Sequence, residues 1–254
     1  MLKKRIIPIQ LLLDDRLVKT VSFGDYRDVG DPVKSAAVYN SQYADELMFL
    51  NIDRNGRSIE PMAKLIERVS EVSFMPLAVG GGIRSYEDAA FLIRHGADKV
   101  VINSAAYGDA TPIRHTAETF GSQAVIVGID ARYDADAGRY VAYSHNGTRR
   151  RDILLPDHIA RCIEQGAGEI MIQSIDRDGT MSGFDVPLIR QVMAAAGVPV
   201  IACGGSGNYE HLKEAFLETD VSALGCGSLF NFSDSNPIRA MNFLSNYGLA
   251  FKRV

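Results

Sequence analysis

Asp130 is the side chain best placed for acid–base chemistry. It ends the apolar run Ala124-Val-Ile-Val-Gly-Ile-Asp130, and a run of this kind is typical of a strand buried on both faces. A carboxylate at the end of such a strand is suited to proton transfer. Asp is also a favoured turn residue, so a carboxylate that only caps a turn is the alternative. We predict Asp130 as the catalytic residue.

Glycine-rich or small polar turns follow four other apolar runs. Glycine lets backbone N–H groups approach an anion, and a helix N-terminus adds a favourable partial charge. The turns could also serve only as tight connections, but they occur as two matching pairs. We therefore expect two phosphate sites and an extended ligand with two phosphates. The candidate residues in these turns are Gly81, Gly82, Asn103, Ser104, Gly204, Gly205, Gly227 and Ser228.

Short apolar runs alternate with helical patterns throughout the chain. The expected strands are Arg5–Gln10, Glu46–Asn51, Pro76–Gly80, Lys99–Asn103, Ala124–Ile129, Glu169–Ser174, Pro199–Cys203 and Ala223–Cys226. The expected helices are Val33–Tyr43, Ile59–Val72, Glu87–His95, Pro112–Phe120, Pro156–Gln165, Pro187–Ala196, Tyr209–Leu217 and Pro237–Asn246. Eight such units in 254 residues predict one α/β domain, a single (β/α)8 TIM barrel over residues 1–254. A β-hairpin inserted near 133–151 interrupts the alternation.

The chain contains an internal repeat of about half its length. Ala44–Gly56 resembles Ala167–Gly179, and Met75–Gly82 resembles Val198–Gly205 at the same offset of 123 residues. Several matches at one offset predict two duplicated half-barrels. Aligning strand one on the strand of Asp130 places Leu11 at the equivalent position, and a leucine cannot transfer a proton.

Composition excludes several other classes of function. A net charge of −4 gives no basic surface for nucleic acid, and no apolar run is long enough to span a membrane. The three cysteines are far apart, which favours a reducing, cytoplasmic compartment. The five histidines have no metal-ligand spacing, so we expect no metal and no cofactor.

The chain resembles, over essentially its whole length, the cyclase subunit of imidazole glycerol phosphate synthase in histidine biosynthesis. Among the motifs that carry the resemblance are Val79-Gly-Gly-Gly-Ile-Arg84, Gly96-Ala-Asp-Lys99, Ile102-Asn-Ser104, Gly166-Ala-Gly-Glu169, Asp176-Arg-Asp-Gly179 and Ala202-Cys-Gly-Gly205. The resemblance implies a phosphorylated small-molecule ligand near Lys19, Asp178 and Gly179, with Lys19 on a mobile loop after strand one.

It also implies a glutaminase partner on the N-terminal barrel face, near Asp98, whose ammonia passes through the barrel. The charged ring at which ammonia enters in that family is matched by Arg5, Glu46, Lys99 and Glu169. All four fall near strand starts, where two cations and two carboxylates can pair. A purely structural plug of the barrel is the alternative.

Leu11 departs from the family, which has an aspartate on strand one. Asp14 or Asp53 could substitute, but each lies beyond the matched position. The departures resemble a subgroup associated with lipopolysaccharide biosynthesis, in which the barrel supplies ammonia to a separate sugar amidotransferase ligase. We favour such an ammonia-conducting subunit of a glutamine amidotransferase. The alternative is an active cyclase-lyase that makes imidazole glycerol phosphate and AICAR, and a related sugar isomerase ranks last.

Overall fold

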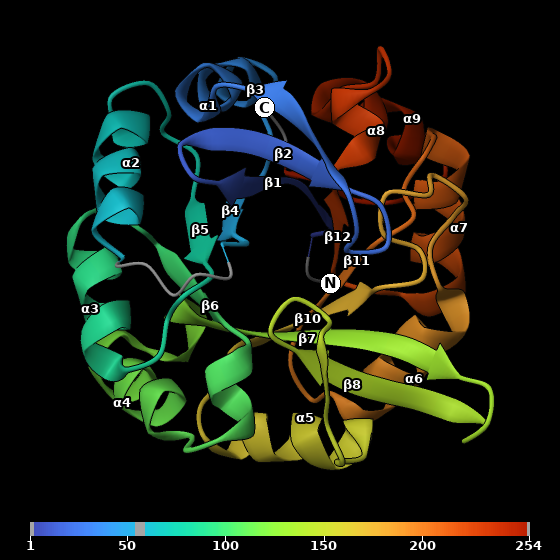
Figure 1. Ribbon diagram of the computed structural model, residues 1–254. Coiled ribbons are helices and arrows are strands. Elements are labelled where there is room, and N and C mark those ends of the chain that lie inside the picture. The colour runs from blue at the N-terminus through green and yellow to red at the C-terminus, as the bar shows by residue number, and fades with distance from the viewer. Residues whose placement is uncertain (1–2, 54–58, 253–254) are drawn as a thin grey trace.

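The computed structural model describes residues 3–53 and 59–252. Eight parallel strands form a closed ring, with the helices packed around the outside (Figure 1). The barrel strands are β1 (Arg5–Leu13), β4 (Leu47–Asn51), β5 (Leu77–Gly80), β6 (Lys99–Ile102), β7 (Val125–Asp134), β10 (Glu169–Ser174), β11 (Val200–Cys203) and β12 (Ala223–Cys226). Pairing of β12 with β1 and of β7 with β10 closes the ring. The predicted TIM barrel is confirmed.

The helices begin where the sequence supplies caps. Asp31 accepts a hydrogen bond from the backbone N–H of Lys34, and Ser85 forms a reciprocal capping box with Asp88. Pro32 occupies the first turn of α1, where its missing N–H costs nothing. The helices are α1 (Pro32–Ser41), α2 (Glu60–Ser70), α3 (Tyr86–Arg94), α4 (Thr111–Phe120), α5 (Leu155–Glu164), α6 (Val186–Ala195), α7 (Tyr209–Thr219), α8 (Ser228–Asn231) and α9 (Pro237–Ser245), with 3₁₀ turns η1 (Ser104–Tyr107) and η2 (Ser122–Ala124). Among the described residues, no helix is both long enough and apolar enough to cross a membrane.

Apolar side chains fill two layers. The larger cluster lies between the strands and the surrounding helices. The smaller cluster fills the inside of the barrel, with Ile7, Met48, Ile126 and Ile201 completely buried. Burial on both faces explains why the strands are continuously apolar in sequence.

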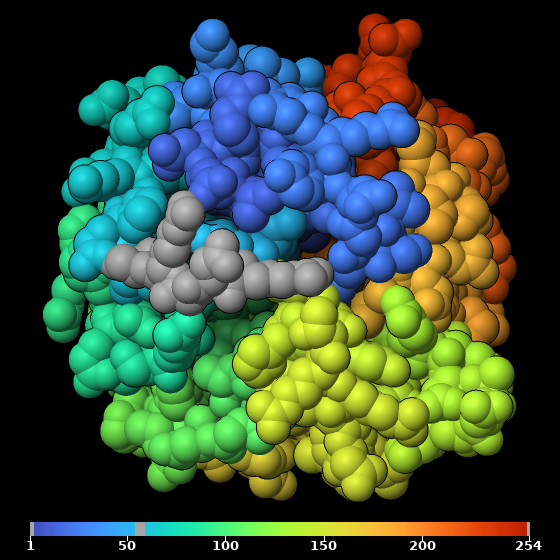
Figure 2. Space-filling model, in the orientation of Figure 1, coloured from blue at the N-terminus to red at the C-terminus, as the bar shows by residue number. Residues whose placement is uncertain are grey.

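Two antiparallel hairpins extend from the C-terminal end of the barrel. One consists of β2 (Arg16–Thr20) and β3 (Tyr26–Gly30), and the other of β8 (Arg139–Ser144) and β9 (Arg149–Arg150), with β8 pairing to the extended end of β7. In Figure 2 the blue segment that contains the first hairpin and the yellow-green segment that contains the second come together across the front of the molecule.

The first hairpin was not predicted. Strand one continues three residues past its expected end at Gln10, and a tight turn at Asp14, whose φ is +53°, sends the chain back along β1. Lys19, expected on a mobile loop, therefore lies within β2. This expectation was wrong because the hairpin pairing gives the segment regular structure.

Candidate functional site

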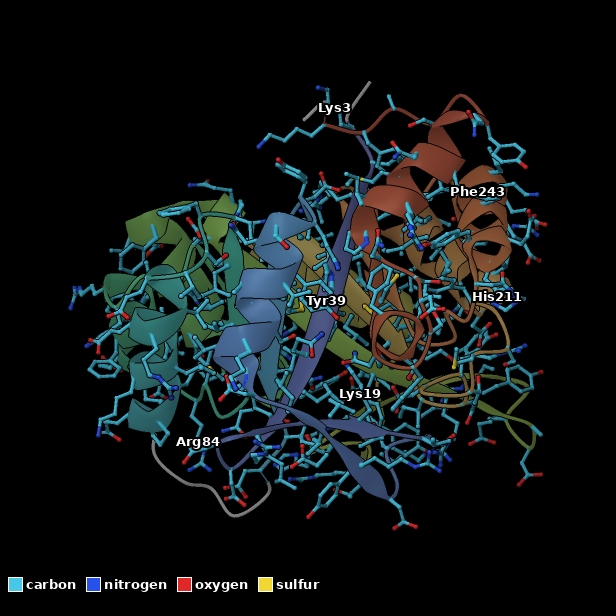
Figure 3. All side chains as sticks on the ribbon, turned by 90° about the horizontal axis from the view of Figure 1, so that it is seen from above. Lys3, Lys19, Tyr39, Arg84, His211 and Phe243 are labelled. Carbon is cyan, nitrogen blue, oxygen red and sulfur yellow. The ribbon has the colours of Figure 1, made fainter. Side chains whose placement is uncertain are left out.

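A cavity of about 1700 Å³ opens at the C-terminal end of the barrel. In the side view of Figure 3, Arg84 marks this end, Lys3 marks the opposite end and Lys19 lies between them. The cavity brings together every residue predicted for ligand binding or proton transfer. These are Lys19, Gly81, Gly82, Asn103, Ser104, Asp130, Asp178, Gly179, Gly204, Gly205, Gly227 and Ser228.

Asp130 is a buried carboxyl group in the cavity wall. Strand β7 runs on to Asp134, so Asp130 lies within the strand rather than at its end, and it pairs with Gln173 of β10 and Tyr143 of β8. Its Oδ2 accepts a hydrogen bond of 3.0 Å from Asn103 Nδ2. Burial raises the pKa of Asp130 to about 7, partly opposed by the Asn103 hydrogen bond and reinforced by the charge of Asp178. A carboxyl group that titrates near pH 7 can act as an acid or a base.

The strand-one position of the predicted pair is apolar. Leu11 pairs with Leu50 of β4, and both pack against the inner cluster beside Ile9. Asp53 lines the cavity, whereas Asp14 is not among the lining residues. Besides Asp130, the carboxylates that line the cavity in the described part of the chain are Asp25, Asp53, Glu87, Asp109 and Asp178.

The glycine turns are partly required by packing. A Cβ on Gly81 would lie 2.0 Å from the Asn51 carbonyl oxygen, and one on Gly205 would lie 2.0 Å from that of Gly183. Gly82 differs, because a Cβ there would meet no atom within 4 Å. The tight-turn explanation therefore applies to Gly81 and Gly205, while Gly82 leaves its backbone open to a ligand.

Lys19 lies against the second pair of turns. Its ammonium group donates to the Ile9 carbonyl oxygen and would lie 2.8 Å from a Cβ on Gly227. Burial lowers the pKa of Lys19 to about 8, against the opposing charge of Asp178. Asp178 in turn accepts a 2.7 Å hydrogen bond from Thr20 Oγ1, which ties the β2–β3 hairpin to the loop after β10. A bound anion would favour the charged form of this buried lysine.

At the N-terminal end, Arg5, Glu46, Lys99 and Glu169 form a ring of alternating charges. Glu46 Oε2 lies 2.9 Å from Arg5 Nη1 and 2.8 Å from Lys99 Nζ. Glu169 lies 2.6 Å from Lys99 and also pairs with Arg5. Burial alone would raise the pKa of Glu169, but the hydrogen bond and charge of Arg5, followed by those of Lys99, lower it overall. The predicted convergence of these four side chains is present.

Asp98 directly precedes the ring residue Lys99 in the sequence. Its Oδ2 accepts a 2.8 Å hydrogen bond from the Leu77 backbone N–H, and it lines a second cavity of about 270 Å³ with Phe74 and Met75. Within the described ranges, no group of three or more His, Cys, Asp or Glu side chains is arranged to hold a metal ion.

The sequence is similar to those of known proteins over the whole chain. The model of a family described as "Histidine biosynthesis protein" matches residues 5–235. The chain is 42% identical over 254 residues to an imidazole glycerol phosphate synthase subunit HisF of Hyphomonas neptunium, covering 100% of both chains. The HisF subunit of Staphylococcus carnosus is 39% identical over 249 residues, 98% of each chain, and that of Lactiplantibacillus plantarum is 44% identical over 234 residues, 92% of this chain and 93% of the relative. The chain belongs to the HisF-like histidine biosynthesis family.

These HisF relatives carry names from histidine biosynthesis, and none of the three names refers to a polysaccharide or to sugar amidation. The comparisons therefore fit the alternative function, a synthase of histidine biosynthesis, better than the favoured one. Part of the first repeat segment, residues 54–56, lies outside the described residues.

Sequence reasoning missed several cavity residues of this HisF-family barrel. The lining also includes Phe23, Tyr107, His145, Arg149 and Arg151. The run Arg149-Arg150-Arg151 was a visible signal, but only the fold shows which of the three side chains face the cavity.

Proposed function

We propose that this chain is the ammonia-using cyclase subunit of an imidazole glycerol phosphate synthase, paired with a glutaminase subunit on its N-terminal face. One observation carries the proposal: the charged ring and Asp130 lie on the same barrel axis. Glu169 begins β10, and Gln173, four residues later, pairs with Asp130. At about 3.3 Å per residue, some 13 Å of strand separates the ring from the acid–base group.

The side chains between ring and cavity support passage of a neutral molecule. The inner cluster consists of apolar groups such as Ala78, Val101 and Met171. An ammonium ion would lose its hydration there at high cost, whereas uncharged ammonia would lose much less. Ammonia produced at the N-terminal face would thus reach Asp130 as the reactive free base.

The cavity supports a ligand with two phosphates. The turns at Gly82 and Ser104, after β5 and β6, lie on one side of the ring, and the turns at Gly204 and Gly227, after β11 and β12, lie on the other with Lys19 beside them. A ligand held at both ends would present its middle to Asp130, which can move protons as ammonia adds and the imidazole ring closes.

The test is turnover of the open-chain bisphosphate substrate with ammonium salts and no partner. We expect measurable cyclisation by the wild type and an increase of about 10²–10⁴-fold in Leu11→Asp, which restores a second acid–base group. Leu11→Asn is the matched control, because it has the same shape but cannot exchange a proton. Bound substrate that neither the wild type nor Leu11→Asp converts would refute the proposal.

Leu11 favours a second candidate, in which the barrel conducts ammonia to a separate ligase, such as one that amidates a surface-polysaccharide sugar. Loss of one member of an acid–base pair reduces turnover strongly, so a wild type without cyclase activity that still stimulates its glutaminase would support this function. Rescue of a histidine auxotroph by the wild-type gene would exclude it as the main role.

A further inference from the structure

Three arginines gather on one side of the cavity mouth. Arg84 follows the glycine turn after β5, and Arg149 and Arg151 lie in and directly after β9. All three line the cavity. Burial lowers the pKa of His145, and the charges of Arg151, Arg149 and Arg84 lower it further. The three cations therefore all lie near His145, in the turn between β8 and β9, and line one cavity.

Among the described residues, these arginines have no carboxylate partner. In residues 3–53 and 59–252, no ion pair is formed by Arg84, Arg149 or Arg151. Arg150, between two of them in sequence, behaves differently, because it pairs with Asp134 and does not line the cavity. Like charges held together without counter-charges repel each other, and proteins retain such conflicts mainly at functional sites.

Arg151 is held in a defined position. Its Nε donates a 2.7 Å hydrogen bond to Ser144 Oγ, and its guanidinium carbon lies 4.9 Å from the centre of the Tyr107 ring. That ring stacks on His158 at 4.0 Å with an interplanar angle of 11°. The terminal nitrogens of Arg151 form no hydrogen bond to a described residue. They remain available to an anion in the cavity.

The tip of the second hairpin is hydrogen-bonded to the turn after β6, which adjoins the glycine turn after β5. The backbone N–H of His145 donates a 3.0 Å hydrogen bond to Ser104 Oγ. At the repeat offset of 123 residues, the counterpart of Arg84 in the second half is Gly207. The turn at Gly227, in that half, instead has the buried Lys19 of the first half beside it. The two ends of the cavity are therefore chemically unequal.

We propose that Arg84, Arg149 and Arg151 form a capture subsite for a phosphate monoester dianion at the turn after β5. The inference rests on the proposed two-phosphate ligand and adds which end is recognised by arginine. Guanidinium groups bind phosphate through paired N–H donors. Because Arg84 and Arg149 are exposed, attraction at this end is screened by salt, whereas the buried lysine at the other end is screened much less.

The experiment is a titration of the ¹⁵N-labelled chain with inorganic phosphate, followed at the amide signals of Gly82 and Gly227. Each signal reports the dissociation constant of one turn. We expect the double variant Arg149→Gln/Arg151→Gln to weaken binding at Gly82 about 100-fold, roughly tenfold per arginine, and to leave Gly227 unchanged. Added KCl should weaken binding at Gly82 more steeply than at Gly227.

Arg150→Gln is the matched control, because it removes one positive charge from the same hairpin outside the cavity. It should change neither dissociation constant by more than about twofold. Equal phosphate affinities at Gly82 in the double variant, Arg150→Gln and the wild type, with both turns still binding, would overturn the subsite and leave the proposed function standing. Phosphate binding at neither turn of the wild type would overturn both.

Discussion

The charged ring makes a quantitative prediction about stability. Glu46 keeps only 3% of its side chain exposed and contacts both Arg5 and Lys99. Glu46→Gln keeps the shape but leaves these two cations to share Glu169. Removing one partner of a buried pair costs about 3–5 kcal/mol, and we expect about 3 kcal/mol because Arg5 and Lys99 retain 22% and 16% exposure.

Urea unfolding followed by circular dichroism measures this cost. With a denaturant slope of about 3 kcal/mol/M for a chain of this size, the midpoint of Glu46→Gln should fall by about 1 M. The control is Glu218→Gln, which removes a single surface pair 2.7 Å from Arg190 with side chains 45% and 58% exposed, so its midpoint should move by less than about 0.3 M. Equal midpoint shifts in the two variants would refute the idea that the ring is a tightly paired, desolvated unit.

Three further outcomes follow. Burial raises the folded-state pKa of Asp130 to about 7 from an ordinary 3.8. The contribution of its protonated form to the free energy of unfolding is therefore full below about pH 4 and is lost as the pH rises through 7. In urea unfolding measured across this pH range, Asp130→Asn should show a flatter dependence of stability on pH than the wild type. The pKa of Glu169 is lowered overall. The contribution of its charged form to stability is therefore present above its ordinary pKa of 4.5 and is lost as the pH falls through the folded-state pKa. The thermal midpoint of Glu169→Gln should consequently fall less on acidification than that of the wild type. Gly81→Ala should lose several kcal/mol of stability because its Cβ would meet the Asn51 carbonyl, whereas Gly82→Ala, in open space at φ +82°, should lose only about 1–2 kcal/mol; similar urea midpoints would contradict the contact.

The sequence predicted the barrel because each strand is buried on both faces and therefore reads as a continuous apolar run. The ring was predictable for a related reason: charged residues at the starts of parallel strands must meet at one end of the barrel. Arg5, Lys99 and Glu169 begin β1, β6 and β10, and Glu46 immediately precedes β4. Position along a strand was sufficient to place them.

The two hairpins limited what the sequence could predict. The β1–β2 pairing depends on the turn conformation of Asp14. The neighbouring residues give no sequence signal for that turn, so Lys19 was assigned to a loop. Arg149 and Arg151 line the same cavity as Arg84 because the second hairpin folds back over the mouth and bonds to Ser104. A contact between residues 41 apart in the chain depends on the tertiary path and leaves no local pattern.

The tip of the second hairpin is anchored on three sides. It bonds to Ser104, Asn146 donates a 2.7 Å hydrogen bond to the Ile52 carbonyl, and Gly147 packs against Phe23. Two of these anchors belong to the barrel rim, but Phe23 belongs to the loop between β2 and β3. Phe23 therefore joins the two hairpins across the cavity mouth, and we expect its replacement by Ala to loosen the tip of the second hairpin from the first.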